Sequence, residues 1–183
     1  MVIIIKVALL LLAALFHNID LMPPQPPLGV GGKVYKGQLF ERAVLLWVYG
    51  TWAMITALAF SNSGVLFALH YAYPYSSHIL SNLCPARSPS LDTIGTLTPP
   101  FLFGFSLMIL ATLLRVWCFV TLGPLFTYEV TIKHGHRLIT SGPYSYVRHP
   151  SYSAVFLMLL GAVATFCSHG NYITEWWDHG ISS

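Results

Sequence analysis

The chain has 183 residues, of which 55% are hydrophobic and only 8% are charged. A soluble domain carries roughly 25% charged residues, so this chain has too little polar surface to cover a water-soluble globule. The formal net charge of +3 is small and its basic residues are scattered, which argues against a nucleic-acid-binding surface. The composition therefore predicts an integral membrane protein that binds no nucleic acid.

Four apolar stretches predict an all-α fold of about four transmembrane helices. The first stretch, Val2 to Phe16, is short for a span of roughly 20 residues. It is compatible with a signal peptide, with Lys6 in the basic region, or with a retained first helix; because no small-residue cleavage site follows it, we favour the retained helix. The next segment, Met22 to Gly32, contains four prolines and three glycines and therefore predicts a loop.

The second predicted span runs from Ala43 to Phe60 and contains no charged residue. Its tryptophans, Trp47 and Trp52, suit a helix that faces lipid or the membrane interface. The polar residues 61–64 are expected to end or kink this helix. The stretch Val65 to Tyr75 is then either a second short helix or a continuation of the first.

The third and fourth predicted spans lie in the second half of the chain. Ser76 to Pro100 is polar and contains several prolines, so we expect a loop. The third span, Phe101 to Leu122, contains Arg115, an intramembrane charge that either serves function or is satisfied by a backbone carbonyl. The fourth span, Tyr152 to Cys167, follows Pro150, and proline is tolerated at the start of a helix.

The basic residues predict the orientation of these spans. Six of them fall in the connections after the first and third spans, against two on the opposite side. The positive-inside rule then places both connections in the cytosol. The six are Lys33, Lys36, Arg42, Lys133, Arg137 and Arg148.

Cysteine usage predicts neither a disulfide framework nor a metal site. The three cysteines, Cys84, Cys118 and Cys167, are isolated from one another and from histidines at metal-ligand spacing. Those in apolar runs are expected to behave as small hydrophobic residues.

The connection between the last two spans, Gly123 to Tyr152, differs in composition from every other connection. It contains three histidines, three basic residues, one acid and four tyrosines, whereas a simple connector needs only a handful of residues. We therefore expect a folded site at the cytosolic surface of the membrane.

Two runs in this region, LGPLFTYEV and HRLITSGPYSYVRHPSYSA, carry a family resemblance. They resemble the catalytic core of the isoprenylcysteine carboxyl methyltransferases, with their histidine–leucine, Thr-Ser-Gly-x-Tyr and Arg-His-Pro-x-Tyr elements. The resemblance covers roughly residues 105–165 and departs from the family pattern at Ala154, where the family has glycine. It divides the chain into N-terminal membrane helices, residues 1–122, and a methyltransferase core, residues 123–183.

The resemblance implies that this core binds S-adenosylmethionine. Tyrosine faces suit the cofactor's sulfonium cation and adenine ring, and the free N–H groups near Ser151 suit its methionine carboxylate. The resemblance assigns no catalytic base and no metal. The cofactor-contacting residues that it implies are His136, Arg137, Leu138, Ile139, Tyr144, His149, Pro150, Ser151, Tyr152 and, as a polar contact, Glu129.

The activity implied is methylation of the C-terminal carboxylate of prenylated cysteine in proteins, by a multi-pass protein of the endoplasmic reticulum membrane. Two alternatives remain open, a membrane phospholipid methyltransferase that acts on phosphatidylethanolamine and a non-catalytic relative. The second arises because family members continue with another membrane segment and a polar helix, whereas this chain stops at Ser183. If the chain is complete, we expect weak or no turnover.

Overall fold

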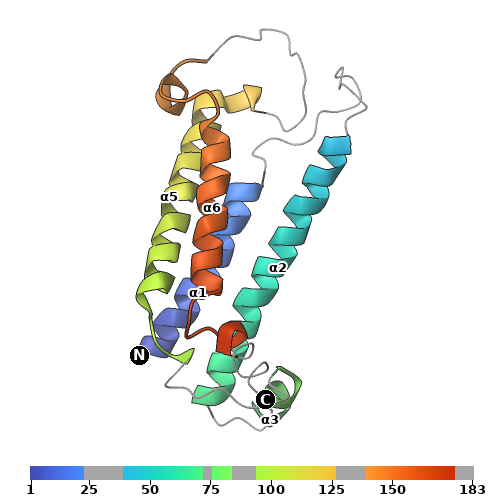
Figure 1. The fold of residues 1–183 in the computed structure, drawn as a ribbon, viewed down its shortest axis with the longest axis vertical. Coiled ribbons are helices and arrows are strands. Elements are labelled where there is room, and N and C mark those ends of the chain that lie inside the picture. The colour runs from blue at the N-terminus through green and yellow to red at the C-terminus, as the bar shows by residue number, and fades with distance from the viewer. Residues whose placement is uncertain (23–38, 72–75, 84–93, 127–138, 176–183) are drawn as a thin grey trace.

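The computed structural model describes residues 1–22, 39–71, 76–83, 94–126 and 139–175. These residues form a bundle of four apolar helices, with no strand in the described ranges (Figure 1). The elements are α1 (Val2–Leu21), α2 (Leu39–His70), α3 (Ser76–Leu83), α5 (Pro99–Leu122), the 3-10 turns η1 (Gly123–Leu125) and η2 (Gly142–Ser145), and α6 (Pro150–Phe166).

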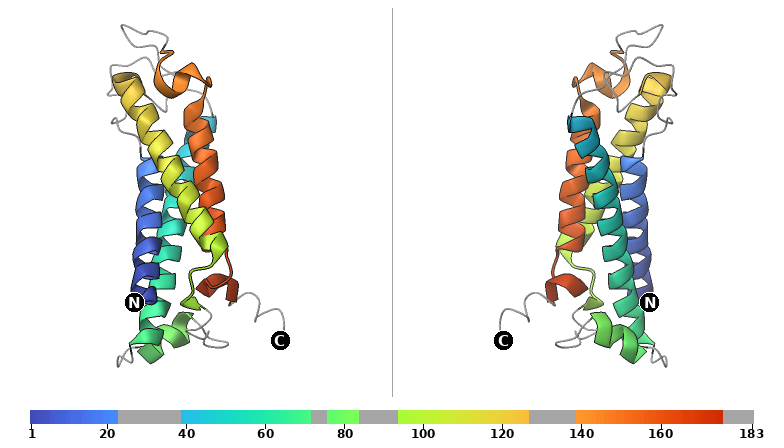
Figure 2. Two further views of the ribbon diagram at one scale, coloured as in Figure 1. Left: turned by 90° about the vertical axis from the view of Figure 1, so that its left-hand side faces the viewer. Right: turned by 90° about the vertical axis from the view of Figure 1, so that its right-hand side faces the viewer.

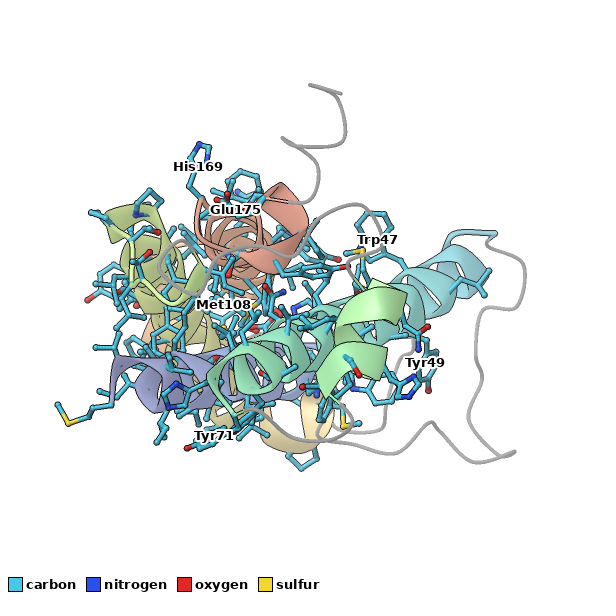
Figure 3. All side chains as sticks on the ribbon, turned by 90° about the horizontal axis from the view of Figure 1, so that it is seen from below. Trp47, Tyr49, Tyr71, Met108, His169 and Glu175 are labelled. Carbon is cyan, nitrogen blue, oxygen red and sulfur yellow. The ribbon has the colours of Figure 1, made fainter. Side chains whose placement is uncertain are left out.

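The helices have the length and surface of a membrane protein. Three segments, Val2–Leu21, Leu46–His70 and Pro99–Leu125, are long and apolar enough to cross a bilayer, and Pro150–Phe166 is a shorter apolar helix. Large apolar side chains such as that of Val120 are exposed, while Met108 lies in the middle of the bundle (Figure 3). The prediction of an all-α membrane protein with about four spans is confirmed.

The first helix is longer than the sequence pattern predicted. It continues past Phe16 to Leu21, because nothing in the sequence stops a helix before Pro23. Leu10 and Ala13 are fully buried against the other helices. The extension carries two further polar residues, His17 and Asp20, into the bundle.

The structure decides between two alternatives in the middle of the chain and corrects one prediction. Helix α2 does not end at residues 61–64 but continues to His70, which is the continuation that the sequence left open. The side-chain amide of Asn62 donates to the carbonyl of Leu58 one turn earlier, at 2.8 Å, and so stays compatible with the helix. The predicted loop from Ser76 to Pro100 begins instead with the short helix α3, which ends before the proline-containing segment.

Helices α5 and α6 cross at unusually close range. A Cβ atom on Gly104 would lie 2.7 Å from the carbonyl oxygen of Gly161, and one on Gly161 would lie 2.7 Å from Cγ of Met108. Glycines let two membrane helices bring their backbones together and gain van der Waals contact. This crossing fixes α6 against α5, and with it the segment that precedes α6.

Helices α1 and α5 end, and α2 and α6 begin, at one end of the bundle (Figures 1 and 2). Toward this end α2 diverges from the other three helices (Figure 1), and Trp47 and Tyr49, on opposite sides of α2, are both exposed (Figure 3). The described residues of the predicted site, on η2 and at the start of α6, lie next to α5.

At the opposite end of the bundle, Lys6 of α1 is buried and fully hydrogen-bonded. Its ammonium group donates to the carbonyls of Ile94 and Thr96 at 2.8 Å each and to that of Gly170 at 2.6 Å. The same nitrogen lies 5.4 Å from the ring centroid of Phe101, within cation–π range. One side chain thus joins α1 to the segments before α5 and after α6.

Candidate functional site

The start of α6 is shaped by the Arg-His-Pro-Ser-Tyr run. His149 occupies the N-cap position and Pro150 the first helical turn, where the fixed backbone angle of proline suits the helix and its missing N–H removes no intrahelical bond. Pro150 is buried and Ser151 is half-buried. Pro150 has no N–H, and the N–H of Tyr152 donates to the carbonyl of His149 at 3.1 Å. The positive end of the helix dipole and the remaining first-turn N–H groups therefore lie at this point.

Arg115 of α5 joins this helix start to the end of α1. Its Nε donates to the backbone carbonyl of Asp20 at 2.9 Å, and its Nη1 donates to the carbonyl of Ser151 at 3.2 Å and to the Ser151 hydroxyl. The guanidinium carbon lies 4.9 Å from the ring centroid of Phe119 and 5.4 Å from that of Phe126. With only 2% of its surface exposed, Arg115 does not extend to the membrane surface but bonds to carbonyls inside the bundle.

Asp20 and His17 place two more polar groups beside this arginine. Both side chains are completely buried, and they are one turn apart on α1. The Asp20 carboxylate interacts electrostatically with Arg115, yet neither of its oxygens accepts a hydrogen bond; both ring nitrogens of His17 also lack a hydrogen-bond partner. Buried polar atoms in native structures nearly always have partners, so this acceptor-rich cluster is a candidate for ligand binding.

The 3-10 turn η2 holds Tyr144 against α5. Gly142 adopts φ +58°, and a Cβ there would lie 2.9 Å from Oγ1 of Thr121 and 3.2 Å from Nε1 of Trp117, so both conformation and space require glycine. Burial, together with the thiol of Cys118, raises the pKa of Tyr144 above its ordinary value. Tyr144 is therefore a neutral, half-buried aromatic side chain near Arg115.

Two other predicted contacts form a separate, outward-facing pair. The rings of His149 and Tyr152 lie with their centroids 5.6 Å apart and their planes tilted by 32°. Tyr152 is 70% exposed, and Tyr146, to which the resemblance assigned no role, is also exposed. The described residues thus place Tyr144, Pro150 and Ser151 toward the interior, and His149 and Tyr152 at the surface.

The remaining predicted site residues divide into two groups. Ile139 is described and half-buried. Glu129, His136, Arg137 and Leu138 lie outside the described residues.

His17 and Asp20 carry no role predicted from the sequence. Their spacing of three residues is a usable signal, because it places two ionisable groups on one face of a helix in an apolar context. The signal was missed because the polar residues after Phe16 were interpreted as the end of the first span. The alternative that Arg115 pairs with a carbonyl is confirmed, and its partner Ser151 is a predicted site residue.

Two further features help to delimit the site. In the part of the chain that the structure describes, no group of three or more His, Cys, Asp or Glu side chains could hold a metal ion. A hollow of about 510 Å³ lies on α2, lined by Leu46, Trp47, Gly50, Thr51 and Met54. Since it offers no ionisable group and involves α2 alone, the candidate site is the Arg115 cluster at the start of α6.

This fold and cluster define a helical membrane protein with a polar site built inside one end of its bundle. Residues 103–174, which span α5, η2 and α6, match the isoprenylcysteine carboxyl methyltransferase (ICMT) family. The resemblance to this family is confirmed over that region. It covers Arg115 and the start of α6, whereas His17 and Asp20 lie outside it.

Individual relatives agree with the family match. The chain is 35% identical over 68 residues to protein-S-isoprenylcysteine O-methyltransferase B of Arabidopsis thaliana, covering 36% of this chain and 34% of that protein. It is 33% identical over 67 residues to a probable protein-S-isoprenylcysteine O-methyltransferase of Oryza sativa subsp. indica, covering 36% of this chain and 35% of that protein. It is also 28% identical over 92 residues to the uncharacterized protein YpbQ of Bacillus subtilis, covering 50% of this chain and 54% of that protein.

The chain spans about a third of the length of these plant relatives and about half that of the bacterial one. No solved structure matches the chain.

Proposed function

We propose that this chain is an S-adenosylmethionine-dependent membrane methyltransferase that esterifies the C-terminal carboxylate of prenylated cysteine in proteins. The observation that carries the proposal is that the matched segment, residues 103–174, contains both Arg115 and the first turn of α6. The residues present suit the cofactor, because this turn offers anion-binding N–H groups and a buried Asp20 with unsatisfied oxygens lies across Arg115 from it.

The proposal gives particular residues the task of holding the donor. Tyr144, half-buried and neutral, offers an aromatic face to a cation or an adenine ring, and Ser151 with the start of α6 receives the methionine carboxylate. Ile139, His149 and Tyr152 complete the described part. Glu129 and the stretch from His136 to Leu138 remain proposed contacts by resemblance.

The chemistry makes small demands on the protein. The cofactor supplies a methyl group on a sulfonium, whose leaving group is a neutral thioether. The acceptor carboxylate is already ionised at neutral pH, so the methyl passes to a carboxylate oxygen without proton transfer. The protein then contributes orientation and exclusion of water, which fits a site enclosed by apolar helices. A prenylated acceptor dissolved in the bilayer would reach it from the side, in the endoplasmic reticulum membrane.

The test is a transfer assay with purified chain in detergent and radiolabelled S-adenosylmethionine. We expect a base-labile methyl ester on a farnesylated cysteine acceptor and no label on phosphatidylethanolamine. Label on the phospholipid would favour the phospholipid methyltransferase. Cofactor binding without transfer to either acceptor would favour the non-catalytic relative, and both results would overturn the proposal.

Two tyrosine variants, one at the candidate site and one on α2, test whether transfer depends on the candidate site. Replacing Tyr144 by alanine should lower transfer by about tenfold, since an aromatic contact to a cation contributes roughly 1 kcal/mol or more when desolvated. Tyr49 on α2 is exposed, so Tyr49→Ala is the matched control and should leave transfer unchanged.

A further inference from the structure

The Asp20 carboxylate is the least satisfied charged group in the described part of the bundle. It is completely buried, and both of its oxygens lack hydrogen bonds. Burial of an ionised carboxylate is expensive unless charges and hydrogen-bond donors compensate it. The nearby guanidinium of Arg115 balances the charge, but its described hydrogen bonds go to the carbonyl of Asp20 and to Ser151.

Two helix ends of opposite polarity meet at this point. The last turn of α1, which contains Asp20, carries the negative end of its helix dipole, and the first turn of α6, which contains Ser151, carries a positive end. A single guanidinium bonds to both turns, so they are separated by no more than the width of that group and its hydrogen bonds. A cation is favoured on the α1 side and an anion on the α6 side.

A ligand that matches this arrangement carries an ammonium group and a carboxylate on neighbouring atoms. The α-amino acid end of a methionine derivative has this form. Its carboxylate suits the positive end of α6 and the first-turn N–H groups that remain beside the one that Tyr152 donates to His149. Its ammonium supplies the hydrogen-bond donors that the Asp20 oxygens lack. Since Asp20 and Arg115 offset each other in charge, the site accepts a zwitterion without a net charge imbalance.

We propose that Asp20 of α1 binds the ammonium group of the methionine moiety of the methyl donor. The inference rests on the proposed function, because it presumes a donor with an amino acid end held at the start of α6. It adds a residue that lies outside the family-matched segment, residues 103–174. Helix α1 is therefore part of the binding site in addition to its role in packing.

The experiment compares two ligands that differ in the amino acid end. S-adenosylhomocysteine carries the ammonium and carboxylate, and methylthioadenosine keeps the nucleoside and the sulfur but lacks both groups. Binding of each is measured by calorimetry on the full chain in detergent, for the wild type and for Asp20→Asn. Loss of a charged hydrogen bond in Asp20→Asn should weaken the binding of S-adenosylhomocysteine by on the order of 10- to 100-fold. The affinity for methylthioadenosine should stay within about twofold of the wild-type value.

Two further variants serve as controls. Asp20→Glu retains the carboxylate and should recover part of the lost affinity for S-adenosylhomocysteine. Glu175→Gln makes the same acid-to-amide change at the opposite end of the bundle, where Glu175 accepts a hydrogen bond from the Gly170 N–H at 3.1 Å. It should leave both affinities unchanged.

The outcomes separate this inference from the proposed function. Equal weakening of both ligands by Asp20→Asn, or no weakening of either, would overturn the role of Asp20 while the methyltransferase proposal stands. Failure of the wild type to bind either ligand would overturn both. If Asp20→Asn does not fold, the wild type is tested with deaminated S-adenosylhomocysteine, and an affinity equal to that of the parent ligand would refute the inference.

Discussion

At one end of the bundle Lys6 donates all three of its ammonium hydrogens to backbone carbonyls, whereas at the other end Asp20 has no hydrogen-bond donor for either carboxylate oxygen. Both groups belong to α1 and both are buried. A fully bonded buried charge fixes structure, and an incompletely bonded one retains hydrogen-bonding capacity for a ligand. We therefore expect the Lys6 end to contribute to stability and the Asp20 end to contribute to ligand binding.

Removal of the Lys6 charge should have the largest effect on stability. Lys6→Met keeps the length of the side chain but leaves three buried carbonyls without their donor. We expect the free energy of unfolding to fall by about 3 kcal/mol, measured by denaturant unfolding in detergent micelles. The affinity of the folded fraction for S-adenosylhomocysteine should not change. A variant that unfolds like the wild type but loses ligand binding would reverse the roles assigned to the two ends.

A methyl group at the α5–α6 crossing should have the next largest effect. A Cβ on Gly104 would lie 2.6 Å from the backbone nitrogen of Thr165, so the helices must move apart, and we expect Gly104→Ala to cost about 2 kcal/mol of stability. Gly50 on α2 has nothing within 4 Å of its Cβ position. Gly50→Ala is the matched control and should be neutral or stabilising by about 0.5 kcal/mol, through helix propensity.

The smallest predicted effect is at the turn that holds Tyr144, and it should alter binding more than stability. In Gly142→Ala the new Cβ is added at a positive φ and contacts the side chains of Thr121 and Trp117. In Gly123→Ala it is added at a positive φ of +50°, with nothing within 4 Å of it. Both should lose about 1 kcal/mol through backbone strain. In calorimetry, only Gly142→Ala should lower the affinity for S-adenosylhomocysteine. Equal losses of affinity in the two variants would show that η2 does not contribute to ligand binding.

Composition and local pattern predicted the helices well and their polar contacts poorly. The ends of α5 and α6 fall within two residues of the predicted spans, because apolar runs bounded by proline and glycine carry that information locally. The end of α1 was misplaced, because the guanidinium that offsets the charge of the buried Asp20 comes from α5. Arg115 is 95 residues from Asp20 along the chain, and no local pattern encodes such a partner.

The candidate site shows the same division between local and distant information. The motif predicted Ser151 and Tyr144, whose backbone conformations depend on neighbouring glycine and proline. Both lie beside Arg115, and their role in binding stays a prediction. The motif did not indicate that Tyr152 would be mostly exposed, because that depends on the packing of α6 against α5. A resemblance confined to residues 103–174 also gave no information on α1.

The three acceptors of Lys6 have a consequence for biogenesis. They belong to residues 94, 96 and 170, so the first helix leaves the ribosome long before its charge has a partner. A lysine at the centre of a membrane helix costs roughly 2.5–3.5 kcal/mol on insertion scales, and one near a helix end, as Lys6 is in α1, costs less because it can extend to the interface. The newly made first helix must therefore keep this ammonium hydrated at the bilayer surface or in the translocon. Only the synthesis of Gly170, after α6, supplies the third acceptor, which makes the final bonding of Lys6 a late event in the assembly of the bundle.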